Sequence, residues 1–346
     1  MAAYEFWAQR DGADYLKLSV PSDSTPTIDW TADAQIKASA ALQCVYDARI
    51  SWLTDDLAIY RVAGGVRECL GVFCVTTSPI STDESGVQIQ SLTGYDQTYV
   101  LVELSRLEYT HTVRAGTGYM DAILEQLIAA GIHQMMLTDC PDRVATDMAW
   151  EPGTSRYDII SQLLSDINYR DLWFNGSGCA ICEPWAPAAI TPATHTYDAS
   201  AASGMLVEME QDCDTFSAAN VFVSIVSSAD IAGEMRAESV NDDISSPLSV
   251  QRRGRRIPVV ETLDSIASQD ALQARANMNK LHSMMSTELY TFYTSADTER
   301  AHGLNDAILL QRDGVGLLEE QDWSLECAPG GTMTHTGRRV YYNLDS

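Results

Sequence analysis

The sequence predicts a mainly β protein of the α+β class that is divided into several compact units. Three observations predict this class: strand-like patterns occupy both ends of the chain, helical patterns lie between them, and 346 residues exceed what one small core holds. Hydrophobic residues make up 45% of the chain and charged residues 20%, as in an ordinary globular protein. We therefore expect roughly two to four compact units.

Residues 1–105 are predicted to form short strands. Thr27–Trp30 and Leu57–Val62 have the composition of strands, Gly64-Gly65 marks a turn, and Glu68–Val75 is a further strand. Several short strands at this spacing are typical of a small sandwich or barrel. We predict a first β-barrel domain over residues 1–105.

Residues 106–190 are predicted to form a compact α+β domain. Thr117 can cap a helix over residues 118–130, and Ser155 precedes a second helix with the spacing of a capping box. The apolar stripe of the second helix comprises Ile159, Ile160, Leu163, Leu164 and Ile167. The Asn175-Gly176 pair predicts a hairpin turn, and the link out of the domain is marked by Pro184, Pro187 and Pro192.

The rest of the chain is predicted to form a second β-barrel domain that contains an insertion. Strand patterns assign residues 191–235 and 286–346 to this barrel. Residues 236–285 are predicted to form a small inserted domain with one helix, from Asp270 to Met285, which Ser268 caps. The order of a β unit, an α+β unit and a second β unit hints at a duplication.

The charge balance is strongly acidic. The chain has 22 Lys and Arg against 48 Asp and Glu, which gives a formal net charge of -26. Such a surface repels nucleic acid, because DNA-binding proteins neutralise phosphates with basic residues. Two interpretations stay open: the charge serves solubility alone, or the surface lies near DNA without binding it.

The sequence shows no pattern of a membrane span or a secretory signal. No stretch approaches the roughly 18 consecutive apolar residues that a membrane helix needs. The start of the chain lacks a basic segment followed by an apolar run. We therefore expect the protein to be synthesised in a cytoplasm and not to insert into a membrane.

The search for catalytic chemistry is mostly negative. The sequence contains no H-E-x-x-H, G-x-S-x-G or Walker motif. Cys179 and Cys182 form a C-x-x-C in a strand-like stretch without a second pair, which favours neither zinc binding nor redox function. No histidine stands four residues from another, and the six are His111, His133, His195, His282, His302 and His335. We predict no catalytic residue, no cofactor and no metal ligand.

One basic cluster departs from the acidic character of the chain. It consists of Arg252, Arg253, Arg255 and Arg256. A guanidinium group pairs with a carboxylate through two hydrogen bonds, so the cluster favours an interface with an acidic neighbour, such as another copy of the chain. The alternative is a solvated loop. We predict that these four arginines form an interface.

The order of several motifs resembles that of tailed-phage baseplate hub proteins. In the first half these motifs are Leu70–Phe73, Gly94–Asp96, Ala115–Gly118, Trp150–Leu164, Asn168-Tyr169 and Asn175-Gly176. In the second half they are Asn220-Val221, Ser246–Val250, Gly254–Pro258, the helix from Ala271, and Gly303–Asp306. Their order and spacing cover nearly the whole chain.

The resemblance implies two similar β-barrel domains, an α+β domain between them and a small domain inserted in the second barrel. It implies a homotrimeric ring with pseudo-sixfold symmetry in the virion, which joins the sixfold tail tube to a threefold tip. The partners would be a distal tail or tail tube protein and spike or fibre proteins. DNA would pass through the lumen without specific binding during ejection and host-cell entry. The matched positions carry no catalytic residues in that family, so the resemblance implies a structural protein and no enzyme.

Two other classes of function remain open. A cell-wall hydrolase or a protease would use the scattered histidines and acidic residues. A carbohydrate-binding adhesin built on β-sandwiches would use the 7 Trp and 15 Tyr residues, although aromatic residues are also ordinary core material.

Overall fold

The computed structural model describes residues 2–82, 84–186, 188, 192–198, 200, 203–213, 218–226, 235–244, 246–285, 288–298, 302–303 and 305–340. These residues are mainly in strands, which confirms the predicted α+β, mainly β class. They form four hydrophobic cores, one in each of four units. None of the described helices combines the length and the apolar character needed to cross a membrane. Pro187 of the predicted link lies outside the described residues.

The first β unit covers the N-terminal residues. Its strands are β1 (Ala3–Arg10), β2 (Ala13–Lys17), β3 (Thr27–Thr31), β4 (Ala38–Val45), β5 (Asp56–Ala63), β6 (Val66–Thr77), β7 (Ile80–Thr82) and β8 (Gln88–Tyr95). Alternate side chains of β4 are buried, as period-two strands with one core face require. The core includes Leu42, Leu57, Phe73 and Leu92, so the strands predicted in this region are confirmed.

The α+β unit follows directly. Its elements are the π-helix η1 (Val100–Leu104), β9 (His111–Val113), α1 (Tyr119–Ala129), β10 (Met135–Leu137), β11 (Met148–Trp150), α2 (Arg156–Asp166), β12 (Trp173–Phe174) and β13 (Ala180–Cys182). Oγ of Ser155 accepts a hydrogen bond from the backbone N–H of Asp158 at 3.0 Å, which confirms the predicted cap of α2. The predicted cap of α1 is wrong: Gly118 is its N-cap residue and no side chain caps it.

The hairpin predicted at Asn175-Gly176 is present, because β12 pairs antiparallel with β13. Oδ1 of Asn175 accepts hydrogen bonds from the backbone N–H groups of Ser177 and Cys179, both at 3.1 Å. Gly176 lies against β6 of the first β unit, where an added Cβ would stand 2.3 Å from the carbonyl oxygen of Cys69. Only glycine therefore lets the α+β unit approach the first β unit this closely.

The second β unit comes from two separate parts of the chain. Its strands are β14 (His195–Asp198), β15 (Met205–Cys213), β19 (Glu288–Ser295), β20 (Ala307–Gln311), β21 (Gly316–Glu326) and β22 (Thr332–Arg339). Its core comprises Tyr197, Tyr290, Phe292, Ile308, Leu310, Val315 and Leu318.

The inserted unit is larger than predicted. Its elements are β16 (Val221–Val226), β17 (Met235–Val240), α3 (Val250–Arg253), β18 (Pro258–Leu263) and α4 (Gln269–Met285). The predicted boundary at residue 235 is wrong, because β16 is the central strand of the small sheet β17-β16-β18 and not part of the second β unit. An apolar strand with one polar residue fits either place by composition, and only its pairing decides. The helix predicted from Asp270 to Met285 is confirmed, and Oγ of Ser268 accepts from the N–H of Ala271 at 3.1 Å.

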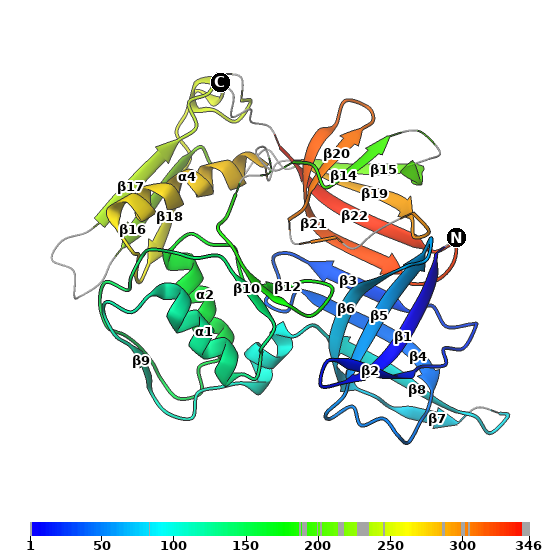
Figure 1. Cartoon of the computed structure of the whole chain (residues 1–346). Helices are drawn as coiled ribbons and strands as arrows, with labels where there is room; N and C mark the ends of the chain where they lie inside the picture. Colours follow the sequence, from blue (N-terminus) through cyan, green and yellow to red (C-terminus); the bar gives the residue numbers. More distant parts are fainter. Residues whose placement is uncertain are drawn as a thin grey trace.

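Figure 1 shows the two β units side by side, with the α+β unit and the inserted unit along one flank. The two β units share one sheet, because β3 of the first pairs antiparallel with β21 of the second. Trp30 stands opposite Trp323 in this pair, and their rings stack with centroids 5.8 Å apart. We call this pair of strands the internal joint.

The two β units have the same strand order. The first pairs its strands as β1-β5-β6-β8-β4-β3, and the second as β14-β20-β21-β22-β19-β15. In both units the strands also follow each other along the chain in the same sequence. One difference is orientation: β1 runs antiparallel to β5, whereas β14 runs parallel to β20.

The match extends to single residues. Val75 pairs with Gly94 in the first unit, and Glu320 pairs with Gly337 in the second; each pair is followed by a register shift. The next strands agree too, because Ile59 pairs with Gly71 as Leu310 pairs with Gly316. We call residues that occupy the same place in matching strand pairs counterparts. The register makes the two β units a structural duplication at the level of individual residues.

Candidate functional site

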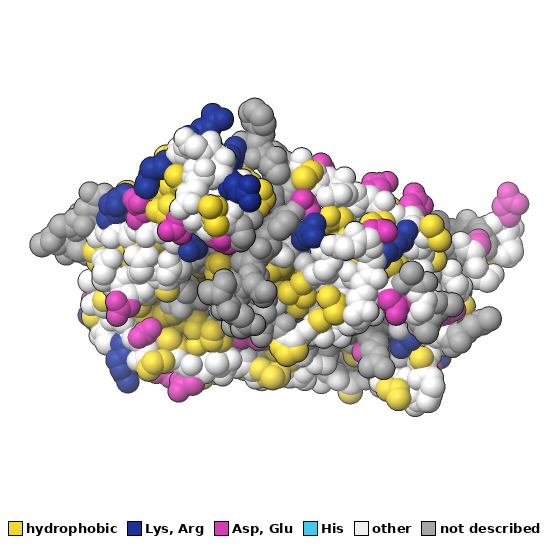
Figure 2. Space-filling model, turned by 90° about the horizontal axis from the view of Figure 1, so that it is seen from above, with side chains coloured by type: hydrophobic (Ala, Val, Ile, Leu, Met, Phe, Trp, Pro, Cys, Tyr) yellow, Lys and Arg dark blue, Asp and Glu magenta, His cyan; other side chains and the backbone are white. Residues whose placement is uncertain are grey.

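The four predicted interface arginines lie at one end of the inserted unit, around α3. Nε of Arg252 donates to the carbonyl of Ile244 at 2.8 Å, and Nη1 of Arg253 donates to that of Ala218 at 2.5 Å. Nη2 of Arg256 donates to Glu238 at 2.6 Å. Figure 2 shows Lys and Arg side chains gathered over the part of the molecule that carries the inserted unit.

These contacts bind three of the four guanidinium groups to their own unit. The pKa of Glu238 lies below its usual value because Arg236 and Arg256 both donate hydrogen bonds to it. Arg255 is exposed, and its side chain has no hydrogen bond or ion pair within the described residues. The structure brings the four arginines together, and their role in an interface stays a prediction.

Several strands pair on one side only within the described residues, and two of these edges have counterparts that pair at the internal joint. Within the described residues β15 pairs with β19 alone, whereas its counterpart β3 pairs with both β4 and β21. The pairing of β5 with β6 ends at Cys74, and residues 77–82 beyond it pair with β8 alone among the residues that the structure describes. Its counterpart in β21 pairs with β3 through residues 322–326. We call these the β15 edge and the β7 edge.

A buried histidine cluster occupies the second β unit. Nδ1 of His302 lies 2.6 Å from one carboxylate oxygen of Glu320, and Nδ1 of His335 lies 2.7 Å from the other. The three side chains are at most 2% exposed. The opposite ring nitrogens face hydroxyl groups: Tyr197 at 3.3 Å from His302, and Thr294 at 2.8 Å from His335.

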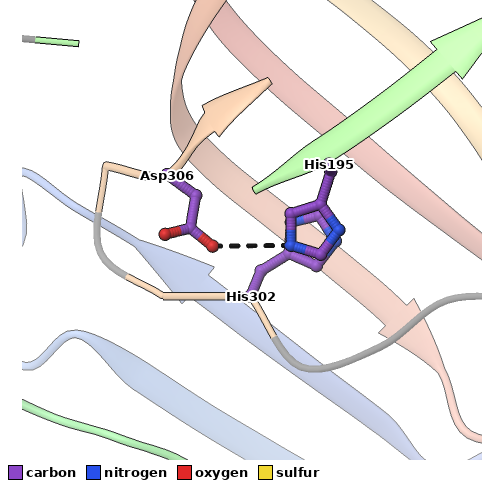
Figure 3. Close-up of side chains that lie close together, drawn as sticks. All are labelled: His195, His302 and Asp306. Atoms are coloured by element: carbon purple, nitrogen blue, oxygen red, sulfur yellow. Dashed lines mark ion pairs between the residues drawn. The ribbon is translucent and has the colours of Figure 1, made fainter. Parts of the chain in front are cut away.

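A further histidine and a carboxylate border this cluster. Figure 3 shows the imidazole rings of His195 and His302 lying one over the other beside Asp306. The ring centroids are 3.6 Å apart, and Nε2 of His195 lies 3.5 Å from Asp306. Three of the six histidines of the chain thus meet in one place. Sequence spacing could not find them, because they stand on β14, the segment before β20, and β22.

The carboxylate at the centre of the cluster is held in its charged form. Burial acts to raise the pKa of Glu320, but the charges and hydrogen bonds of His302 and His335 outweigh it and lower the pKa to about 2. The space beside Glu320, which Trp30 and Trp323 also line, has no room for a water molecule. The cluster is therefore sealed from substrates, and its chemistry is restricted to protons or a small ion.

One cleft with titratable side chains lies between the first β unit and the α+β unit, with a volume of about 710 Å³. Burial raises the pKa of Asp56 in this cleft to about 6. Its carboxyl forms no hydrogen bond or ion pair with His133, the histidine that lines the cleft, within the described residues.

The C-x-x-C motif ends in a strand of the α+β unit: Cys179 precedes β13, and Cys182 is the last residue of β13. Cys182 is buried in β13, and burial raises the pKa of its thiol to about 12. A protonated, buried thiol is neither a good nucleophile nor a ready metal ligand. The eight cysteines, all of them described residues, form no disulfide with one another.

No family model matches the chain, and no curated protein matches it in sequence. Solved structures match it over nearly its whole length. The tail protein of Neisseria meningitidis MC58 matches with a TM-score of 0.67 and 11% identity, covering 97% of both chains. The 43 kDa tail protein of prophage MuSo2 from Shewanella oneidensis has a TM-score of 0.66 and 13% identity, covering 97% of this chain and 98% of that one.

A third match is the Escherichia coli protein c3393, described as a component of the type VI secretion system with structural similarity to the T4 bacteriophage tail proteins gp27 and gp5. It has a TM-score of 0.56 and 9% identity, and the match covers 97% of this chain and 77% of that one. The chain therefore has the fold of phage tail proteins, which confirms the predicted resemblance at the level of fold.

Proposed function

We propose that the chain is a structural subunit of a phage tail baseplate hub that works by assembling into a ring, and that it is no enzyme. The internal duplication carries this proposal. Two β units are joined through one pair of edges, while the β15 edge and the β7 edge each pair on one side only within the described residues. A joint that is used once within the chain can be repeated between chains.

Such a repeated joint is head-to-tail, because the β15 edge of one copy would meet the β7 edge of the next. Head-to-tail contacts give a closed ring when the rotation between subunits closes. We propose that three copies close, so that six β-barrels surround a lumen. A homotrimer of this kind offers sixfold contacts to a distal tail or tail tube protein and threefold contacts to spike or fibre proteins.

The charge of the chain supports a channel for DNA. A net charge of -26 per copy repels phosphates, so DNA would pass through the lumen of the virion without specific binding. The solved structures with this fold also support the proposal, since they are named as tail proteins or as a component of a secretion system.

The native mass of the purified protein tests the proposal. We expect a species of three copies at micromolar concentration, measured by mass photometry or sedimentation. A Lys at Ile80, on the β7 edge, should shift the mass toward one copy. The matched control is V66K. Val66 is 68% exposed and lies in β6, but it already pairs with β5, so V66K should leave the mass unchanged. A monomer at every concentration of the unaltered protein would contradict the ring.

A further inference from the structure

We propose that neighbouring copies join by antiparallel pairing of the β15 edge with the β7 edge, in the register of the internal joint. This inference rests on the ring proposed above and adds the residues at its contact. The register comes from the duplication, because each edge has a counterpart whose partner is known.

The register transfers through the matched strand pairs. Ile80 pairs with Gln90 as Leu325 pairs with Met333, so Ile80 is the counterpart of Leu325. Tyr290 pairs with Gly337 in the second unit as Ala40 pairs with Gly94 in the first, so Tyr290 and Ala40 are counterparts. On their other side, Tyr290 pairs with Gln211 and Ala40 pairs with Ile28. Gln211 is therefore the counterpart of Ile28.

The internal joint pairs Leu325 with Ile28 and Trp323 with Trp30. Between copies, the same register places Ile80 opposite Gln211 and, two residues away, Ser78 opposite Cys213. The contact would thus run from Ser78 to Thr82 on one copy and from Met209 to Cys213 on the other.

Burial at the joint and exposure at the edges agree with this pairing. Ile28 is 0% and Leu325 2% exposed at the joint, whereas Ile80 is 47% exposed, and Gln211 and Cys213 are exposed as well. An open edge that presents an exposed isoleucine is a template for another strand unless something covers it. A second copy would cover it as β3 covers β21.

The chemistry of the two edges is compatible. The β15 edge carries Glu210 and Asp212, and the β7 edge consists of Thr, Ser, Pro and Ile residues without charge, so no like charges meet. Pro79 costs no bond at the contact. Its carbonyl accepts from Ser91 on the β8 side, so its nitrogen also faces β8 and the outer edge keeps its donors.

A disulfide trap tests the register. Directly opposed residues of antiparallel strands bring Cα atoms about 4.5–5.5 Å apart, within the range of a disulfide. In S78C, oxygen with a copper catalyst should take one hydrogen from the introduced thiol and one from Cys213 on the next copy, and leave one S–S bond between them. Non-reducing electrophoresis should then show covalent dimers and closed trimers.

The controls separate the register from the assembly. S81C faces Glu210 in the proposed register and should give no cross-link, and S78C in a Cys213→Ser background should give none either. A trimer in which S78C stays unlinked while S81C links would overturn the register and leave the ring standing. Monomeric protein without cross-links would overturn both.

A different observation carries a second inference: we infer that His302, Glu320 and His335 bind one zinc ion. Their ligand atoms all lie within 4.8 Å of one another. In the first β unit, the counterparts of Glu320 and His335 are Val75 and Leu92, both apolar and buried. The second unit has replaced apolar core by groups that are costly to bury, which needs a function.

The geometry fits zinc after a small adjustment. Zinc prefers imidazole nitrogens and carboxylate oxygens at about 2.0–2.2 Å in a tetrahedron, which sets ligand atoms about 3.3 Å apart. The carboxylate and the two Nδ1 atoms would therefore separate by about 0.6–0.7 Å from their hydrogen-bonded distances of 2.6 and 2.7 Å. The second carboxylate oxygen can complete the coordination only as part of a bidentate carboxylate, because it is held closer to the first oxygen than the tetrahedral spacing.

The outer hydroxyl groups suit both forms of the cluster. When Nδ1 carries the proton and donates to Glu320, Nε2 accepts from the hydroxyl of Tyr197 or Thr294. When Nδ1 binds zinc, the proton stands on Nε2, which donates to the same hydroxyl, because a hydroxyl both donates and accepts. The sealed core makes the ion structural.

Metal analysis tests this inference. We expect tag-free protein purified without chelators to contain about one zinc ion per chain by mass spectrometry of the metal. Removal of zinc should lower the melting temperature, and Co²⁺ should restore it with the visible absorption bands of tetrahedral cobalt. E320Q should lose the metal, while the control H133A should keep it. Unaltered protein that contains no zinc and whose melting temperature does not respond to added Zn²⁺ would overturn the inference.

Discussion

The stacked tryptophans of the internal joint provide a quantitative test of how the two β units are held together. Trp30 and Trp323 are each 5% exposed, and Trp323 packs in the core of the first β unit although it belongs to the second. Truncation of a buried Trp to Ala costs about 3–5 kcal/mol, so W323A should lower the free energy of unfolding by about 4 kcal/mol.

The contact between the two rings contributes part of that loss. Stacked aromatic pairs contribute about 0.5–1.5 kcal/mol beyond their buried area, so W30A and W323A together should cost about 1 kcal/mol less than the sum of the single changes. W323F is the matched control, because it keeps a ring and removes an indole N–H that has no hydrogen-bond partner among the described residues. It should change stability little.

Guanidinium unfolding followed by far-UV circular dichroism measures these differences. W323A should also separate the unfolding of the two β units into distinct transitions, since the joint is their shared sheet. A loss below about 1 kcal/mol for W323A, with a single unchanged transition, would refute the view that the joint couples the units.

Three further predictions concern other parts of the molecule. Burial raises the pKa of Asp166 from 3.8 to about 6, so the folded state binds this proton more tightly and the stability of the protein falls as the pH rises from about 4 to 6. D166N should remove this loss of stability, which is about 3 kcal/mol at pH 7. Thermal melts across this pH range measure it, and melting profiles of D166N and the unaltered protein that run parallel would contradict it. G176A should destabilise the protein by roughly 1–3 kcal/mol, because its methyl group would meet the carbonyl of Cys69, and an unchanged melting temperature would disprove the close contact. Replacing Arg252, Arg253, Arg255 and Arg256 with Ser should weaken assembly, measured by sedimentation. R255S alone should also weaken it without changing the melting temperature, and unchanged assembly of both variants would refute the predicted arginine interface.

Local signals in the sequence predicted local structure well. The cap of α2 at Ser155 and the cap of α4 at Ser268 are short-range contacts between a side chain and the backbone three residues on, and both are confirmed. Thr117 failed as a cap because the helix begins one residue later than the pattern indicates. The prediction places β16 in the wrong unit, because the hydrophobic periodicity of a strand does not show which strands it pairs with, here β17 and β18.

The features that matter for function are long-range. The histidine cluster joins His302, Glu320 and His335, with His195 beside it, and no spacing within one element predicts this arrangement. In the sequence, the duplication shows only in the order of the β and α+β regions, because counterpart residues of the two β units are rarely of the same type. For example, Val75 corresponds to Glu320, and Leu92 corresponds to His335. The glycines at 94 and 337 keep the same role, since a Cβ at either would stand about as close to the neighbouring strand.

The head-to-tail joint between copies can be tested most directly by mixing two single-edge variants. I80K blocks the β7 edge and Q211K blocks the β15 edge, so each alone should be a monomer by mass photometry. In an equimolar mixture, the intact β15 edge of I80K can pair with the intact β7 edge of Q211K. We expect a species of two copies that contains one of each variant and grows no further. A mixture that stays monomeric, or variants that each still form the ring, would contradict the account.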